Sequence, residues 1–269
     1  MFRTIAALVI GLLIGGGAIA LVKGGDDDSG EKSSATNPLG VAKVVDLSHT
    51  VDEQIPLWPG DPPMKFTTVA NFKDDGYYLR KFSIGEHSAT HMNAPNSFHA
   101  NGVGIDHYKA SDLIRKAVMI DVKDKAAADP DYAFSVDDLK AWEAENGEVP
   151  VGSVVLLNTG WTQYWRNPKK FFGLDGKGGL HFPGFDGETT KYLLDQRDIA
   201  GVGIDTHGVD PGQDETYATN TQMLAKPRIV LENLTNLDQM PATGADIVIA
   251  PLKLKDGSGS PATVTGLIP

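Results

Sequence analysis

Gly85-Glu86-His87-Ser88-Ala89-Thr90-His91-Met92-Asn93-Ala94-Pro95 places two imidazoles and a carboxamide at even spacing just before a proline. In an extended segment the side chains at 87, 91 and 93 point to one side, whereas on a helix the side chain at 93 would point away from the other two. We therefore expect a strand or strand end here, with the three side chains converging on a metal ion. No glutamate directly follows His87, so the helical zinc-protease motif is absent.

Short apolar runs on both sides of this stretch alternate with amphipathic segments. The runs predict strands at residues 44–47, 79–84, 117–120, 154–157, 199–204, 229–231 and 247–252. A capping-box pattern from Ser135 to Asp138 predicts a helix that ends near Asn146-Gly147, and a second helix is expected over 189–196. This order predicts an α/β fold, a mixed β-sheet or barrel-like core with flanking helices in a single domain.

The composition limits the chemistry that the chain can perform. Among its 269 residues there is no cysteine, which excludes disulfides, thiolate nucleophiles and thiolate zinc sites. The formal net charge of -11 argues against nucleic acid as a partner. Histidine, carboxylate, amide and hydroxyl groups remain as candidate functional groups.

The first residues have the pattern of a targeting segment. After Arg3, an unbroken run of apolar residues and glycine extends over 5–22, which is near the lower length limit for a transmembrane helix. Ala18-Ile19-Ala20 is also typical of a signal-peptide cleavage site, so residues 1–23 are predicted to be a signal peptide or a membrane anchor. Residues 24–40 would be a flexible polar linker, and 41–269 the folded domain. Either alternative predicts export, to the periplasm or the outer face of the cytoplasmic membrane.

Seven motifs occur together in the order found in one known family. They are Asp46-Leu47-Ser48-His49, Trp58-Pro59-Gly60-Asp61, the stretch from His87 to Pro95, Leu156 to Trp161, Gly203-Ile204-Asp205-Thr206, Leu231-Glu232 and the tail from Pro251 to Pro261. Over about residues 44–261 the chain resembles the cyclase family, and within it the bacterial kynurenine formamidases and isatin hydrolases. The resemblance implies metal-dependent hydrolysis of a small amide or lactam, usually with zinc or manganese, and a homo-oligomer.

The family motif His-x-Gly-Thr-His-x-Asp-x-Pro-x-His contains three metal ligands and a final acid-base histidine. His87 and His91 match the first two ligands. Asn93 stands where the family has the aspartate ligand, and Ser97 where it has the catalytic histidine. Farther along, Glu232 matches a glutamate ligand, whereas Asn220 stands near the place of a histidine ligand. The departures therefore fall on the residues that perform the family's reaction.

From these residues we predict one divalent ion, zinc or manganese, held by His87, His91, Asn93 and Glu232 with water in an open position. Such a water would attack the carbonyl carbon. Because Ser97 cannot replace an imidazole as a general base, His99 and His207 are the candidate proton-transfer residues. Trp58 is a candidate for stacking on a flat substrate ring.

Two other classes of function compete with metal-dependent hydrolysis. The first is a protein that keeps the fold and binds a small ligand without catalysis, since Asn93, Ser97 and Asn220 all depart toward weaker metal binding. The second is a serine hydrolase. It is disfavoured because no Gly-x-Ser-x-Gly motif occurs, and Gly257-Ser258-Gly259-Ser260 reads as a turn-like tail.

Overall fold

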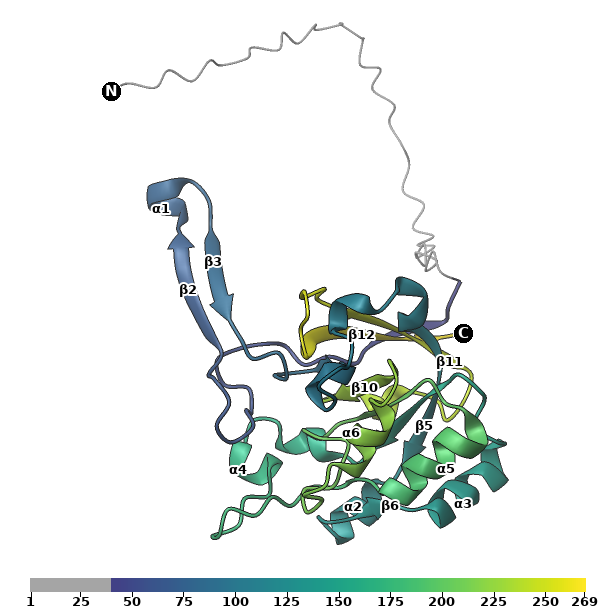
Figure 1. The fold of residues 1–269 in the computed structure, drawn as a ribbon. Helices are drawn as coiled ribbons and strands as arrows, with labels where there is room; N and C mark the ends of the chain where they lie inside the picture. The colour runs from purple at the N-terminus through teal and green to yellow at the C-terminus, as the bar shows by residue number, and fades with distance from the viewer. Residues whose placement is uncertain (1–39) are drawn as a thin grey trace, which may run out of the picture. The chain divides into compact units, whose positions relative to one another are not determined.

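The computed structural model describes residues 40–269, whose core is a closed barrel of seven strands with helices packed against it (Figure 1). The strand order around the barrel is β12-β11-β5-β7-β9-β10-β4, and β4 pairs again with β12 to close the ring. Strand β1 adds to the outer edge of β12. Because β5, β7, β9 and β10 are parallel and the other pairings antiparallel, the sheet is mixed. The predicted fold class is therefore confirmed.

The strands are β1 (Lys43–Asp46), β2 (Lys65–Ala70), β3 (Leu79–Ser83), β4 (His91–Asn93), β5 (Ile114–Asp121), β6 (Ala133–Phe134), β7 (Val154–Asn158), β8 (Gly184–Phe185), β9 (Gly201–Ile204), β10 (Ile229–Glu232), β11 (Ala245–Pro251) and β12 (Gly259–Ile268). The α-helices are α1 (Phe72–Asp75), α2 (Lys123–Ala128), α3 (Val136–Asn146), α4 (Pro168–Phe171), α5 (Gly187–Arg197) and α6 (Ala218–Met223). Short 3-10 turns complete the description at Pro95–Ser97, Ile105–His107, Ala110–Leu113, Trp161–Tyr164 and Leu237–Gln239.

Both long helices begin where the sequence predicted. The side chain of Ser135 accepts a hydrogen bond from the backbone N–H of Asp138 and caps α3, which ends at Gly147. Each of the seven predicted strands also falls on an observed strand. The tail is different: a turn was predicted over 257–260, but β12 begins at Gly259, and neither this strand nor β2 was predicted. The prediction failed there because glycine, serine and proline in the first residues of β12 give no apolar run.

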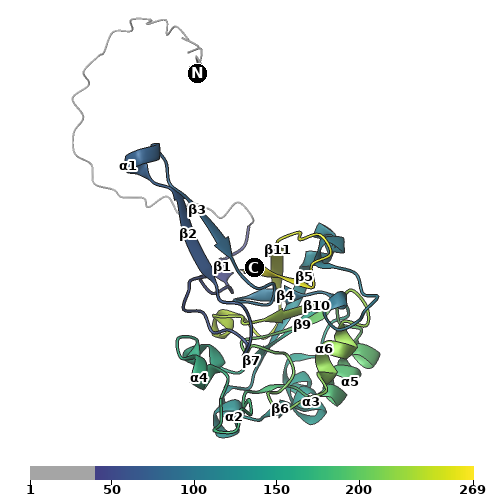
Figure 2. The same ribbon diagram turned by 60° about the vertical axis from the view of Figure 1, so that its left-hand side comes forward.

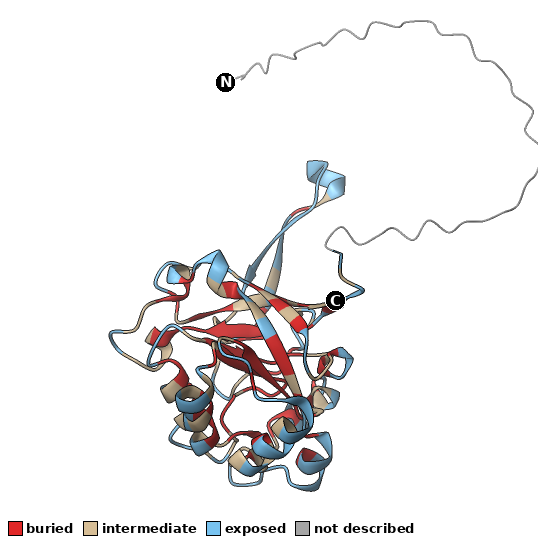
Figure 3. Cartoon of the chain, turned by 90° about the vertical axis from the view of Figure 1, so that its right-hand side faces the viewer, coloured by how far each residue is buried: buried red, intermediate tan, exposed pale blue. Residues whose placement is uncertain are grey.

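Alternating side chains of the central strands divide the apolar core in two. On β7, Leu156 packs inside the barrel with Met92 and Leu231, whereas Val155 and Leu157 face the helices α3, α5 and α6. Figure 3 shows the strands as the most buried part of the molecule. Burial of apolar surface on both faces makes the parallel strands rigid. Polar side chains at the ends of these strands are consequently held in fixed positions.

A two-stranded arm, residues 65–83, extends away from the barrel (Figures 1 and 2). It consists of β2, the short helix α1 and β3, and nearly all of its residues are exposed. Its exposed large apolar side chains are Val69, Phe72, Tyr77, Tyr78, Leu79 and Phe82. At its base, a groove of about 290 Å³ runs between the arm and strands β11 and β12, and Met64, Phe66, Phe82 and Leu252 are among its lining residues.

Within residues 40–269, no helix has the length and apolar character that a bilayer crossing requires. The predicted signal peptide or anchor at 1–23 and nearly all of the predicted linker lie outside the described residues.

Candidate functional site

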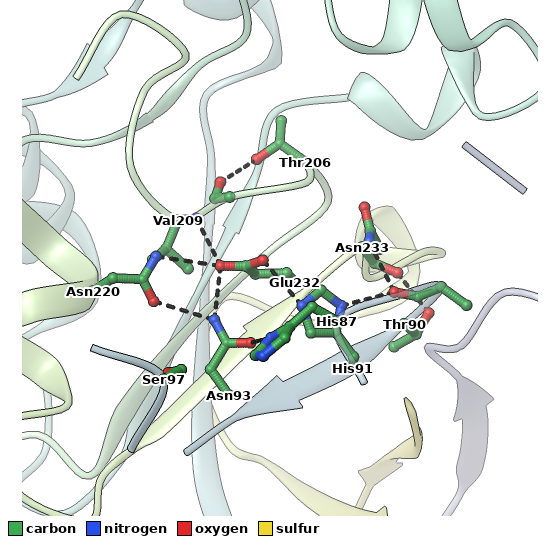
Figure 4. A network of polar contacts seen from close by, with 12 residues as sticks. His87, Thr90, His91, Asn93, Ser97, Thr206, Val209, Asn220, Glu232 and Asn233 are labelled. Atoms are coloured by element: carbon green, nitrogen blue, oxygen red, sulfur yellow. Dashed lines mark hydrogen bonds and ion pairs between the residues drawn. The ribbon is translucent and has the colours of Figure 1, made fainter. Parts of the chain in front are cut away.

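Two neighbouring strands and the turn before them bring the predicted metal ligands together (Figure 4). His91 and Asn93 lie on β4, and His91 is the register partner of Glu232 at the end of the antiparallel strand β10. His87 comes from the preceding turn, and its ring lies against Gly259, where a Cβ atom would stand 2.7 Å from the ring. The glycine at 259 is therefore needed for this approach. The rings of His87 and His91 are 5.5 Å apart, but His87 reaches this position from a turn and not from the extended segment on which the even spacing was argued.

The converging side chains form hydrogen bonds with one another (Figure 4). The Asn93 amide Nδ2 donates to Glu232 Oε1 at 3.0 Å and to Asn220 Oδ1 at 3.1 Å, and its Oδ1 lies 2.9 Å from His87 Nδ1. Asn220 Nδ2 in turn donates to Asp210 Oδ2 at 2.9 Å. The opposite orientation of the Asn93 amide would place its oxygen against two other oxygens, so the network fixes the orientation. Both donors and the acceptor of Asn93 are therefore used within the protein.

An ion pair joins the network to the barrel. His91 Nε2 lies 3.1 Å from Glu232 Oε2, although its N–H bond does not point well enough at the oxygen for a hydrogen bond. Burial favours the neutral form of Glu232, but its interaction with His91 and the nearby imidazoles outweighs burial and lowers the pKa of the carboxyl group. Glu232 is therefore ionised at neutral pH.

A cavity of about 510 Å³ opens above this network. Trp58 and His207, both predicted as site residues, line it together with His87, Asn93 and Glu232. The ring centroids of Trp58 and His207 are 5.5 Å apart. Burial, followed by the charge of His91, lowers the pKa of His207 to about 4. Its Nε2 atom is buried and has no hydrogen-bond partner.

The other candidate for proton transfer, His99, and the serine that stands in place of the family's catalytic histidine are both directed elsewhere. His99 is not among the residues that line the cavity, and its Nε2 lies 2.9 Å from the backbone carbonyl oxygen of Thr221. Ser97 lines the cavity, but its hydroxyl group donates to the carbonyl oxygen of Ala94. The Asp205 carboxylate is fully buried and accepts hydrogen bonds from Thr159 and the backbone of Trp161, which gives it a structural role.

The donor groups at the cavity floor do not fit a tightly held divalent ion. His91 Nε2, buried beside a carboxylate and without a hydrogen bond, would suit one. Three features oppose it. Asn93 presents its N–H groups to Glu232, Asn220 supplies an amide, and both ring nitrogens of His87 are in contact, with Asn93 Oδ1 and with Ser258 Oγ at 2.8 Å. An amide also lacks the charge with which a carboxylate attracts the ion.

Several residues of the site were not found from the sequence. Asp210 lies in the loop before α6, and its mostly buried side chain accepts hydrogen bonds from the backbone N–H groups of Thr219 and Asn220 in the first turn of that helix. Burial raises the pKa of Asp210 to about 6. Phe98 and Tyr217 meet at one side of the cavity with ring centroids 5.8 Å apart. The Asp-Pro-Gly sequence after His207, which is typical of a turn, was the one local signal for a loop here.

A second group of possible metal ligands lies outside the cavity. Asp106, His107 and Asp256 each offer a ligand atom, and these atoms lie within 4.8 Å of one another. Two of the three side chains are exposed, and Asp106 already accepts a hydrogen bond from the backbone of Asp256. Among the described residues, no other three histidine or carboxylate groups come this close.

Comparison with known proteins identifies the family. A family model described as putative cyclase matches residues 45–211. The isatin hydrolase of Roseibium aggregatum is 31% identical over 248 residues, covering 86% of this chain and 93% of that protein. The kynurenine formamidase of Bacillus cytotoxicus is 24% identical and covers 83% and 96%. The structure of isatin hydrolase A from Ralstonia solanacearum superposes with a TM-score of 0.79 at 32% identity, covering 84% of this chain and 92% of that chain. The chain therefore belongs to the cyclase family, whose compared members are hydrolases.

Proposed function

We propose that this chain is a small-molecule-binding member of the cyclase family, which holds a flat aromatic ligand in its cavity without hydrolysing it through a metal-bound water. The supporting observation is the closed hydrogen-bond network at the cavity floor. Asn93, Asn220 and Glu232 satisfy one another there, at the positions where the family motif has an aspartate, a histidine and a glutamate ligand. The charge and geometry that would attract an ion are replaced by neutral amides.

The proton-transfer groups support the same proposal. A general base works best when its pKa is near the working pH. His207 is the one predicted base that lines the cavity, and its pKa of about 4 makes it a weak base at neutral pH. The hydroxyl group of Ser97 donates a hydrogen bond to the carbonyl oxygen of Ala94, so it is not directed toward a substrate in the cavity.

The cavity itself is suited to a small molecule. Its volume of about 510 Å³ is within the range of about 300–1,000 Å³ that is typical of ligand pockets. Trp58, Phe98 and Phe182 supply aromatic walls, and the edge of Trp58 packs against Phe182 with ring centroids 6.3 Å apart. His207 Nε2 offers a polar group with no protein partner. This combination fits a planar ring with one hydrogen-bonding substituent.

Binding and turnover of the same compounds by the purified full chain test the proposal. Indole, isatin and an aryl formamide are titrated while heat release and compound loss are followed, with and without added zinc or manganese. We expect saturable binding of at least one compound, no loss of any, and weaker binding after Trp58→Ala. The control Trp142→Ala, on α3 and outside the cavity lining, should bind as the wild type does. Absence of saturable binding, or turnover that requires the added metal, would overturn the proposal.

Metal-dependent hydrolysis of an amide or lactam is the second candidate, and one observation favours it. His91 Nε2 is buried without a hydrogen bond, 3.1 Å from a carboxylate and beside His87. If this candidate is right, the metal-dependent turnover just described will occur and a His91→Gln variant will lose it. A matched His107→Gln change in the surface group should leave turnover intact.

We also propose that the ligand is bound outside the cytoplasm, in the periplasm or at the outer face of the membrane. The support is the apolar run at 5–22 with Arg3 before it. In cells that express the full chain, an externally added protease should digest it once the outer membrane is permeable but the inner membrane is intact. Protection under these conditions would contradict the proposal.

A further inference from the structure

The lining of the cavity is acidic. Within the described part of the chain it contains Asp210, Asp214, Glu215 and Glu232, and no lysine or arginine. The other polar side chains of the lining are amides, hydroxyl groups and the two imidazoles of His87 and His207. An anionic ligand would therefore meet carboxylates on the walls and no lysine or arginine to pair with.

The four carboxylates differ in how far other groups of the protein balance their negative charge. Glu232 is paired with His91, and Asp210 accepts backbone N–H groups of α6. Asp214 accepts hydrogen bonds from the backbone N–H groups of Thr216 and Ala218 but has no cationic partner among residues 40–269. Glu215 is exposed and forms no ion pair within the same residues. The mouth of the cavity thus carries uncompensated negative charge.

A second observation points to a donor group on the ligand. His207 is 5% exposed and lines the cavity, yet its Nε2 atom has no hydrogen-bond partner. With the proton on Nδ1, this nitrogen is an acceptor. A buried acceptor without a partner is costly, so the missing partner is an N–H or O–H group of whatever occupies the cavity.

The aromatic walls complete the pattern. Tyr217 has a backbone φ of +50°, which is a strained value for a bulky residue, and this conformation places its ring beside Phe98 at the cavity. Trp58 and Phe182 line the same space. Aromatic faces attract organic cations, and they do so more strongly where water is excluded.

We propose that the cavity ligand is a small aromatic cation, an amine protonated at neutral pH. Its ammonium group donates to His207 Nε2 above the ionised Glu232, its ring lies between the aromatic walls, and the charges of Asp214 and Glu215 attract it to the mouth. This inference rests on the proposed function. The positive charge that the cavity floor lacks comes with the ligand.

Three indoles that differ in charge test the inference: tryptamine (cation), tryptophol (neutral) and indole-3-acetate (anion). Each is titrated calorimetrically into the full chain at low and high salt. We expect tryptamine to bind at least tenfold more tightly than tryptophol, with a preference that falls as salt increases, and indole-3-acetate to bind most weakly. Equal binding of the three, or preference for the anion, overturns the inference but leaves the proposed function standing. If none of the three binds, the inference fails, and the proposed function fails with it only if indole, isatin and the aryl formamide do not bind either.

Variants locate the effect. Glu215→Gln should weaken tryptamine binding about two- to fivefold and leave tryptophol binding unchanged. Glu145→Gln, an exposed carboxylate on α3 outside the cavity, has the same charge change and should affect neither ligand. Replacing His207 with phenylalanine keeps an aromatic ring but removes the acceptor, and should weaken the binding of both tryptamine and tryptophol, since the ammonium group and the hydroxyl group each donate to Nε2. Unchanged binding of both ligands would contradict the assigned contact.

Discussion

At the cavity floor, the amide groups of Asn93 and Asn220 are hydrogen-bonded within the protein, whereas at the arm tip Phe72 and Tyr78 face solvent. The first region has satisfied polar groups but an excess of negative charge around them. The second carries a net charge of +2 and an excess of exposed apolar surface. A small cation would compensate the negative charge of the cavity, whereas the apolar surface of the arm is of the kind that a second copy would bury in the homo-oligomer that the family resemblance implies. The two regions should therefore respond independently to mutation.

The largest expected effect comes from restoring the family's ligands in the cavity. Asn93→Asp with Asn220→His replaces two amides by a carboxylate and an imidazole. One charge at about 4 Å is worth about 4 kcal/mol at an intermediate dielectric, before desolvation. After desolvation, we expect about 10²- to 10³-fold tighter zinc binding, measured by competition with a fluorescent chelator. The change Asn101→Asp in an exposed loop is the matched control and should bind zinc as the wild type does. No gain would show that the amides are not what prevents tight binding.

A somewhat smaller effect is expected from opening the network. Glu232→Ala leaves His91 and the Asn93 amide buried without their partner, and removing one member of a buried ion pair typically costs about 3–5 kcal/mol. The free energy of unfolding, measured with urea, should fall by about 3 kcal/mol or more. Glu145→Ala on the exposed face of α3 should change it by less than about 0.5 kcal/mol. Equal small losses in the two variants would mean that the network contributes little to stability.

The two regions also differ in how far the sequence predicted them. The strand at His91 and Asn93 follows from local periodicity, and β7 from its apolar run, because both signals lie within a few residues. The contact of Asn93 with Asn220 joins residues 127 positions apart, and no local pattern encodes it. Only the resemblance to a family indicated that both positions belong to one site.

The arm and the final strand show features of the fold that local sequence did not predict. Strand β3 was predicted from its composition, but its exposure was not, since an alternating strand normally buries one face. Strand β12 was not predicted, and Gly259 and Pro261 at its start weaken the strand pattern. Gly259 is required there by the ring of His87, which is a tertiary constraint. Local sequence thus predicts elements, and packing decides which faces are covered.

An intermediate effect is expected at His49, which lines the groove at the arm base and stacks on Trp165 with ring centroids 3.8 Å apart. Burial, followed by the charge of Arg166, lowers the pKa of His49 to about 4. The folded state therefore binds its proton less readily than the unfolded state does. The resulting stability is fully present above about pH 6.5 and is lost as the pH falls toward 4. This contribution of His49 to the free energy of unfolding is about 2 kcal/mol, a value reduced because the side chain is partly exposed.

Urea unfolding at pH 7 and pH 4.5 measures this contribution. The wild type should lose about 2 kcal/mol more than a His49→Gln variant between the two values, since glutamine does not titrate. His107→Gln, an exposed histidine away from the groove, should lose as much as the wild type. If His49→Gln is as acid-sensitive as the wild type, the groove does not bury His49 enough to control its protonation.

The smallest effect is expected at the arm turn, and it tests the independence of the two regions most directly. Gly76 has φ +76° and open space around it, so Gly76→Ala adds strain of about 1 kcal/mol without a clash. If the arm holds together the homo-oligomer that the family resemblance implies, its dissociation constant, measured by light scattering at several protein concentrations, should rise about fivefold. Gly176→Ala, also in open space but without the positive φ, should leave it unchanged. Tryptamine binding should be the same in both variants, because the strain lies in the arm and no residue of 65–83 lines the cavity. A change in tryptamine affinity confined to Gly76→Ala would mean that the arm contributes to the cavity, and the two regions would then not be independent.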